Sequence, residues 1–373
     1  MIGGKWGRRA LSAALMAGLL ALAACSGPAR GPEAKELRIY NWSDYIDPSI
    51  LEDFTRETGI KVVYDTFDSV DVLETKVMTG ATGYDIVVPS NLYVPRFVAA
   101  GALQSLDPSR LPNRKNLWPR IMAYMAPFDP GAKYAVPYMW GTVGIGYNPR
   151  LVAARLPRAK VDSWSVVFDP ANLAKLKDCG VYFLSDGQDM YGAALRYLGK
   201  DPNSRAPADY HAASALLTRL RPYVRRFNNS ESIEALANGD ICIAIGYSGD
   251  MLQAADRARE AKNGVTVAYA IPREGTQVWF DNFTIPVDAP HPQNAHRFID
   301  YMLRPAVIAR ASNLLHYANA NLASQPLLRR EVLDDPSVYP PADTFPRLYV
   351  ITPKDQGLLR DVNRQWTRVQ TGQ

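Results

Sequence analysis

Apolar positions along the chain alternate between the spacing of a short buried strand and that of an amphipathic helix. The stretch from Leu37 to Tyr40 has the strand pattern. Asp47-Pro48 then starts a helix, because Asp favours the N-cap and proline favours the first helical position. Gly59 is expected to end this helix, and residues 60–64 form the next strand. A strand, a helix and a strand in this order favour a parallel sheet.

The same two spacings recur further along the chain. Strand patterns cover residues 85–89, 181–184, 241–245 and 265–271. Helical patterns cover residues 70–78, a segment around Phe97 that ends at Gly101, and residues 294–303. The chain is therefore expected to be an α/β protein. Its 373 residues exceed one ordinary hydrophobic core, so two domains or one large domain are expected.

Polar and aromatic clusters follow several of these strands. They occupy residues 41–45, 89–93, 185–189 and 246–250, and a fifth cluster at 279–281 precedes the apolar residues 283–286. Ligands of doubly wound sheets bind beyond the carboxyl ends of the strands. We therefore expect the binding residues among these clusters.

The N-terminus, residues 1–24, is predicted to be a lipoprotein signal peptide. Basic residues precede an apolar run from Ala10 to Ala24, which is too short and too rich in alanine for a membrane span. Leu22-Ala23-Ala24-Cys25 resembles the bacterial lipobox, in which the cysteine is acylated and becomes the first mature residue. The alternative is a plain secretory signal with an incidental cysteine. Residues 25–36, with two prolines and two glycines, are predicted to be a tether.

The other two cysteines, Cys179 and Cys242, are predicted to form a disulfide, since an exported chain reaches an oxidising compartment. No Cys-x-x-Cys spacing or neighbouring histidine suggests a metal or redox site for them. Closing a loop of this length stabilises a fold by about 4 kcal/mol in the chain-entropy model.

Composition and motifs argue against several classes of function. The net charge of +5 includes Lys5, Arg8 and Arg9, so the rest of the chain carries too little charge to suggest nucleic-acid binding. Residues 246–249 resemble the nucleophile elbow of a hydrolase, but the second glycine follows the serine directly instead of one residue later. The sequence also has no P-loop motif. Residues 144–146 lack the third glycine of a dinucleotide fingerprint. His291 and His296 bracket an expected surface loop, and no histidine has a metal-site spacing. No catalytic residue, metal or cofactor is therefore predicted.

Three of the clusters combine an aspartate with aromatic rings: Asp44 with Trp42 and Tyr45, Asp250 with Tyr247, and Asp281 with Trp279. A carboxylate accepts charge-assisted hydrogen bonds from an ammonium group, and an aromatic face attracts the same cation. This pattern favours an organic cation. A sugar site would add Asn, Gln and Arg, and an iron site would use several Tyr or His ligands. The residues alone also allow a structural role for each aspartate.

Long strings from residue 37 onward resemble the spermidine/putrescine-binding proteins of ABC importers. The strings are YNWSDYI at 40–46, TGIKVVYD at 58–65, YDIVVPS at 84–90, PYMWGT at 137–142, LANGDIC at 236–242 and YANAN at 317–321. The resemblance implies a type II periplasmic-binding-protein fold with two lobes, each a mixed, mainly parallel sheet flanked by helices. Lobe 1 is expected at 37–138 and 273–316, and lobe 2 at 139–272 and 317–373.

The resemblance also implies which residues bind the ligand. They are Trp42, Ser43, Asp44, Tyr45, Ser90, Asp189, Tyr247, Asp250, Trp279, Asp281 and Tyr317. Asp189 corresponds to an acidic position that holds a terminal amine. Tyr247 stands where putrescine-type members often have Trp. Trp279 in place of a smaller aromatic residue, with Asp rather than Glu at 189, slightly favours a longer amine. They do not rank spermidine above putrescine. The lipobox is a further departure, since many relatives have no lipid anchor.

The chain is thus predicted to be the solute-binding component of an ABC importer. It would capture putrescine and/or spermidine and deliver the polyamine to permease subunits in the inner membrane, without catalysis. It is expected to be a periplasmic monomer that is lipid-anchored through Cys25 and binds no nucleic acid. The alternatives are another small solute in the same fold (a cationic amino-acid derivative, a sugar or an iron chelate), a polyamine sensor, or an enzyme that acts on polyamines.

Overall fold

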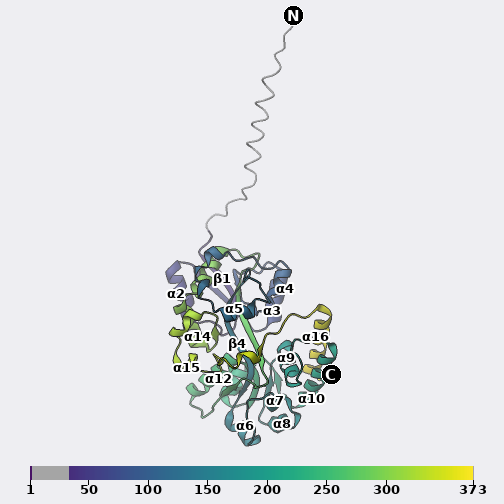
Figure 1. Ribbon diagram of the computed structural model, residues 1–373. Helices are drawn as coiled ribbons and strands as arrows, with labels where there is room; N and C mark the ends of the chain where they lie inside the picture. The colour runs from purple at the N-terminus through teal and green to yellow at the C-terminus, as the bar shows by residue number, and fades with distance from the viewer. Residues whose placement is uncertain (2–32, 373) are drawn as a thin grey trace. The chain divides into compact units, whose positions relative to one another are not determined.

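The predicted strand-helix-strand opening is present in the computed structural model, which describes Met1 and residues 33–372 (Figure 1). Strands β1 (Glu36–Trp42) and β2 (Lys61–Phe67) are parallel neighbours, and α2 (Pro48–Thr58) connects them. The carboxylate of Asp47 accepts a hydrogen bond from the Ser49 amide at 2.9 Å and caps the helix. Gly59 ends it with a φ of 69°, a left-handed conformation that favours glycine. The predicted signal peptide, Cys25 and most of the tether lie outside the described residues.

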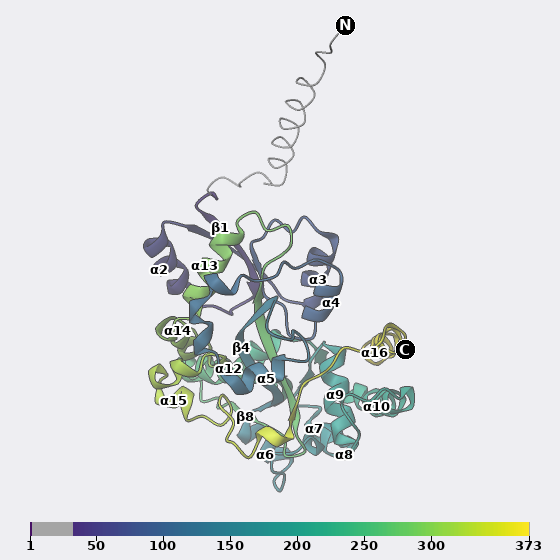
Figure 2. The same ribbon diagram turned by 45° about the horizontal axis from the view of Figure 1, so that its top comes forward.

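Two groups of parallel strands, each flanked by helices, make up residues 35–373. We call them lobe 1 and lobe 2. Lobe 1 contains β1, β2 and β3 (Ile86–Val87) with helices α2, α3 (Val70–Thr79), α4 (Val94–Ala99), α13 (Pro292–Met302) and α14 (Pro305–Leu315). In Figures 1 and 2, α2 and α14 lie on one side of this lobe and α3 and α4 on the other.

Lobe 2 is built around β5 (Val181–Phe183), β6 (Arg226–Phe227) and β7 (Ile243–Tyr247). Its helices are α6 (Pro149–Arg155), α7 (Ser165–Phe168), α8 (Pro170–Leu176), α9 (Gly187–Tyr197), α10 (Pro207–Leu220), α11 (Glu231–Asn238), α12 (Ser248–Ala261) and α16 (Gln356–Thr371). Helices α5 (Pro119–Met125) and α15 (Arg330–Leu333) and the short strands β10 (Ala318–Asn319) and β11 (Leu348–Tyr349) belong to the connecting segments. No helix among the described residues has both the length and the apolar composition needed to cross a membrane.

Two long strands, β4 (Ala135–Tyr147) and β9 (Thr276–Thr284), run through both lobes. The first part of β4 pairs antiparallel with β9, from Ala135 opposite Thr284 to Thr142 opposite Val278. The second part, from Val143 onward, pairs with β7 and with β8 (Ala268–Ala270). The strand order is therefore β2-β1-β3-β9-β4-β7-β5-β6. β4 and β9 thus cross between the lobes, whereas the exact lobe limits stay a prediction.

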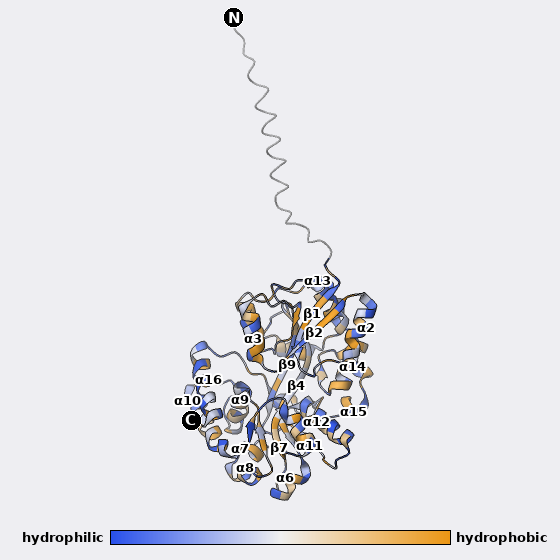
Figure 3. Cartoon of the chain, turned by 180° about the vertical axis from the view of Figure 1, so that it is seen from behind, coloured by the Kyte–Doolittle hydropathy of each residue, from blue (hydrophilic) through white to orange (hydrophobic). Residues whose placement is uncertain are grey.

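The core of the molecule runs along these crossing strands. All nine positions of β9 are buried, and β4 is buried at every position except its last. Figure 3 shows hydrophobic colour gathered on the strands between the helices. A Cβ at Gly144 would lie 2.6 Å from the Ala270 carbonyl oxygen, so the glycines at 144–146 serve close packing in β4.

The structure confirms the predicted disulfide and corrects one prediction on the histidines. Cys179 and Cys242 are joined just before β5 and β7, with their Cα atoms 5.5 Å apart. The segment between His291 and His296 is not a surface loop but the first turn of α13. His296 is buried, and its Nε2 accepts a hydrogen bond from the Asp107 amide at 2.9 Å.

Candidate ligand-binding site

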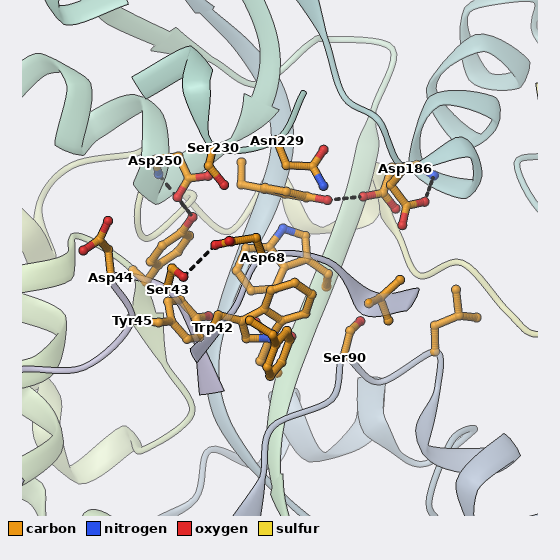
Figure 4. Close-up of a pocket in the computed structure, with 18 of the residues that line it drawn as sticks. Trp42, Ser43, Asp44, Tyr45, Asp68, Ser90, Asp186, Asn229, Ser230 and Asp250 are labelled. Carbon is orange, nitrogen blue, oxygen red and sulfur yellow. Dashed lines mark hydrogen bonds between the residues drawn. The ribbon is translucent and has the colours of Figure 1, made fainter. Parts of the chain in front are cut away.

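All eleven residues expected to bind ligand line one pocket between the two lobes. Lobe 1 contributes the end of β1, the loop that follows it, and Ser90 after β3. Lobe 2 contributes the first turns of α9 and α12. In Figure 4, Asp186, Asn229, Ser230 and Asp250 lie on one side of the pocket, and Trp42, Tyr45 and Ser90 lie on the opposite side. Residues separated by more than 200 positions therefore face one cavity.

Strand β9 forms the floor of the pocket with alternate side chains. Gln277, Trp279 and Asp281 are spaced by two residues, so they point to the same face of the strand. All three are less than 8% exposed. The sequence placed the 279–281 cluster before an apolar strand, whereas the structure places it inside the longer β9. The Nε1 of Trp279 is buried without a hydrogen-bond partner among the described residues.

Four aromatic rings make a continuous row along this floor. The Tyr45 and Tyr317 rings are 5.3 Å apart, those of Tyr317 and Trp279 are 5.3 Å apart, and those of Trp279 and Tyr247 are 5.6 Å apart. Each pair meets edge to face, with interplanar angles of 70–81°. The row starts in lobe 1 and ends in lobe 2, and it offers aromatic surface to an extended apolar chain.

Asp250 is held by Tyr317, the second ring of the row. The Tyr317 hydroxyl donates to Asp250 Oδ1 at 2.6 Å and accepts from the Asp250 amide at 3.1 Å. This contact needs Gly249, because a Cβ there would lie 2.4 Å from the Tyr317 ring. Burial raises the pKa of Asp250 to about 6, against the opposing effect of the Tyr317 hydrogen bond.

Asp281 lies next to the same rings and is 6% exposed. Burial raises its pKa to about 7, and the nearby charge of Asp250 adds to this shift. Two carboxyl groups in this part of the pocket therefore resist ionisation. A cation placed between them would reverse both shifts.

A second pair of carboxyl groups lies at the start of α9. Asp186 caps the helix, and its Oδ1 accepts hydrogen bonds from the amides of Gln188 at 2.8 Å and Asp189 at 3.2 Å. The Tyr247 hydroxyl donates to Asp189 Oδ2 at 2.9 Å. Burial and the neighbouring Asp186 charge raise the pKa of Asp189 to about 8, and burial also raises that of Asp186.

The mouth of the pocket is polar and joins the lobes. Asp44 has a left-handed φ of 52° and a side chain that is 74% exposed. Its Oδ2 lies 3.8 Å from Nη2 of Arg257 on α12, so an ion pair spans the two lobes. Beside it, the Ser43 hydroxyl donates to Asp68 Oδ1 at 2.6 Å.

A family model described as bacterial extracellular solute-binding protein matches residues 49–339. The chain belongs to this family. The putrescine-binding periplasmic protein PotF of Escherichia coli (strain K12) is 49% identical over 97% of this chain and 99% of its own length. The putrescine-binding periplasmic protein SpuD of Pseudomonas aeruginosa (strain UCBPP-PA14) is 46% identical over 93% of this chain and 95% of its own length.

Solved structures match the fold of this solute-binding protein. One titled as a putative spermidine/putrescine ABC transporter from Listeria monocytogenes has a TM-score of 0.80 at 34% identity, over 91% of this chain and 100% of that chain. The expected type II periplasmic-binding-protein fold is thereby confirmed.

Several polar residues of the pocket were not predicted from the sequence. They are Asp68, Asp186, Asn229, Ser230, Gln253 and Gln277. Three of them carry a signal that could have been used. Asp68 follows β2 directly, Asp186 lies in the 185–189 cluster, and Gln277 shares the two-residue spacing of Trp279 and Asp281. The role of the eleven predicted residues in ligand binding stays a prediction.

The pocket of this solute-binding protein combines acidic groups with aromatic walls. Among the described residues, no group of three or more His, Cys, Asp or Glu side chains could hold a metal ion. Trp42 packs on Phe67 with ring centroids 4.5 Å apart, and its Nε1 is buried without a partner in the described part of the chain. Such surroundings favour a flexible organic cation with an apolar middle.

Proposed function

We propose that this solute-binding protein captures a polyamine, putrescine and/or spermidine, between its lobes and delivers it to the permease of an ABC importer in the inner membrane. One observation carries the proposal. Asp189 and Asp281 are buried and Asp250 is half-buried beside one row of aromatic rings, and desolvation raises the pKa of each carboxyl group. An ammonium group provides the countercharge that these carboxyl groups need.

The mechanism is capture without catalysis. A polyamine loses water when it enters the pocket, and charge-assisted hydrogen bonds to the carboxylates offset that cost. The aromatic row covers its methylene groups and attracts its charges. The pocket has one acidic pair at Asp250 and Asp281 and another at Asp186 and Asp189. Because the residues around the pocket come from both lobes, a bound amine stabilises the closed arrangement. The permease then recognises this closed shape.

The names of the relatives support this choice of ligand. Those at 49% and 46% identity are named for putrescine, and relatives at 34% identity are named for spermidine and putrescine or for putrescine and cadaverine. The amide groups of Asn229 and Gln253 also line the pocket and would suit a sugar, but the six acidic residues of the same pocket favour a cation.

Calorimetric titration with putrescine, cadaverine, spermidine and spermine tests the proposal, and a sugar, a cationic amino acid and an iron chelate serve as alternative solutes. At least one polyamine should bind, and only its addition should raise the melting temperature strongly. Binding of an alternative solute in place of every polyamine would refute the proposal.

The first variant to test is Asp250→Asn. The asparagine keeps the size of the side chain and can still accept from Tyr317, but it removes the charge that pairs with the amine. We expect roughly a tenfold or greater loss of polyamine affinity, with a ligand-free melting temperature no lower than that of the wild type. Unchanged affinity in the same titration would show that Asp250 does not contact the ligand charge.

We further propose that the mature protein begins at Cys25, where a lipid anchors it to the membrane, and that it acts in the periplasm as a monomer. The basic, apolar and Leu-Ala-Ala-Cys segments of the N-terminus support the anchor. Mass spectrometry of the exported protein would detect a diacyl modification, and a Cys25→Ser variant should be released from the membrane.

A sensor would share every binding residue, so polyamine uptake by cells that lack this chain separates transport from sensing.

A further inference from the structure

The α9 end of the pocket has a half-buried ammonium group, that of Lys354, behind its two carboxyl groups. Lys354 lies between β11 and α16, and its Nζ donates to the Gln188 side-chain oxygen at 3.4 Å. The same Nζ lies 5.6 Å from the centroid of the Tyr210 ring. Gln188 lies between Asp186 and Asp189 in the sequence, and its backbone amide donates a hydrogen bond to the Asp186 carboxylate. Lys354 is therefore held one side chain away from the acid pair, outside the pocket wall.

Lys354 is the positive group that acts on both carboxylates of this pair. Among the described residues, acidic and phenolic groups also interact with the pair: Asp71 on α3, Tyr93 before α4, Tyr247 on β7 and Tyr349 on β11. Arg205 acts on Lys354, and Arg196 acts on Tyr349. Burial and the nearby Arg205 lower the pKa of Lys354 to about 8, while Asp186 and Asp189 oppose that shift. The side chain thus keeps most of its charge at neutral pH.

We propose that Lys354 determines how many ligand charges the pocket accepts, because it holds a fixed positive charge behind Asp186 and Asp189. The inference rests on the proposed polyamine function and extends it to specificity. Lys354 offsets part of the negative charge at this end and repels an ammonium group placed there. A triamine carries more charge into the pocket than a diamine, so this repulsion acts against it more strongly. The residue therefore favours diamines over triamines.

Lys354→Met tests the inference, since it removes the charge and keeps most of the apolar stem. Wild type and variant are each titrated with putrescine and with spermidine at neutral pH and low salt. Each protein then has one ratio of spermidine to putrescine affinity. The ratio of spermidine to putrescine affinity should rise about tenfold in Lys354→Met, as expected for removing one charge at short range. Lys354→Arg keeps the charge and should keep the wild-type ratio.

Lys115→Met is the matched control, because it removes one positive charge from an exposed position that does not line the pocket. Its ratio should equal that of the wild type. If the methionine variant at 354 does not fold, as judged by its melting curve, Lys354→Gln gives the same comparison with a polar tip. An unchanged ratio in the folded neutral variant overturns the inference, and so does an equal loss of both affinities. A wild type that binds neither amine refutes the proposed function instead.

Discussion

Burial changes the acidity of the pocket aspartates, and this couples the protein to pH. Asp250, Asp281 and Asp189 have pKa values raised from 3.8 to about 6, 7 and 8. The folded, ligand-free protein therefore binds protons more strongly than the unfolded chain does. These groups have no effect on stability below about pH 4, where both states are protonated, and they destabilise the fold progressively as the pH rises towards 8.

We predict that the melting temperature of the ligand-free protein falls between about pH 5 and pH 8, because the buried carboxyl groups must ionise in this range. Saturating amine should remove most of this fall, since it binds the ionised form. Melting curves at a series of pH values, with and without amine, measure both effects. Asp250→Asn should show a smaller fall than wild type. A melting temperature that rises through this range in the ligand-free protein would contradict the prediction.

The binding residues that the sequence predicted are those with a distinctive local neighbourhood. Asp250 and Trp279 were found because an aspartate stood beside an aromatic ring in a recognisable string. Asp186 was missed, because an aspartate directly before a helix is first of all a helix cap, and capping is also its role here. Lys354, which lies behind the pocket wall, was not noted in the sequence, because nothing near it shows that the chain returns to α9.

Elements with strong end signals were predicted well, and elements defined by long-range pairing were not. Helix α2 begins and ends where Asp47, Pro48 and Gly59 indicated. In contrast, β3 is limited to two residues, although the apolar pattern covers 85–89, because its pairing with β1 and β9 extends no further. Strand β4 was not predicted as an element. It is buried on both faces and contains three glycines, so its sequence does not alternate between apolar and polar residues.

The disulfide is an element-scale restraint, because it ties the starts of β5 and β7, which are parallel neighbours. We predict that Cys179→Ser with Cys242→Ser lowers the free energy of unfolding by about 4 kcal/mol, as expected for a bridge between residues 63 positions apart. Urea unfolding followed by fluorescence measures this loss. Polyamine affinity should change little, since neither cysteine lines the pocket. Equal unfolding midpoints in oxidised and serine-substituted protein would contradict the prediction.

At the scale of the whole molecule, the two lobes contact each other around the pocket. The Arg257–Asp44 pair joins the lobes at the mouth, and the aromatic row runs from one lobe to the other. A ligand that contacts both lobes stabilises a closed state relative to an open one. We therefore expect a bound ligand to favour the closed state.

We predict that the radius of gyration measured by small-angle X-ray scattering decreases when the bound polyamine is added. The reason is that the ligand bridges the lobes and shifts the population towards the closed arrangement. Asp250→Asn should need a higher amine concentration for the same decrease. A solute that does not bind in the titrations is the control. Identical scattering with and without saturating polyamine would show that binding does not require movement of the lobes.

The place of β9 in the sheet has a consequence for biogenesis. This strand lies between β3 and β4, yet it follows them by more than 120 residues in the chain. During export the first lobe cannot complete its sheet until residues 276–284 have crossed the membrane, because the strand between β3 and β4 has not yet arrived. The part of the chain before β9, about three quarters of its length, is therefore exported while strand edges are still unpaired, and such edges readily pair with other chains. We therefore expect this protein to depend on holding chaperones until translocation is nearly complete.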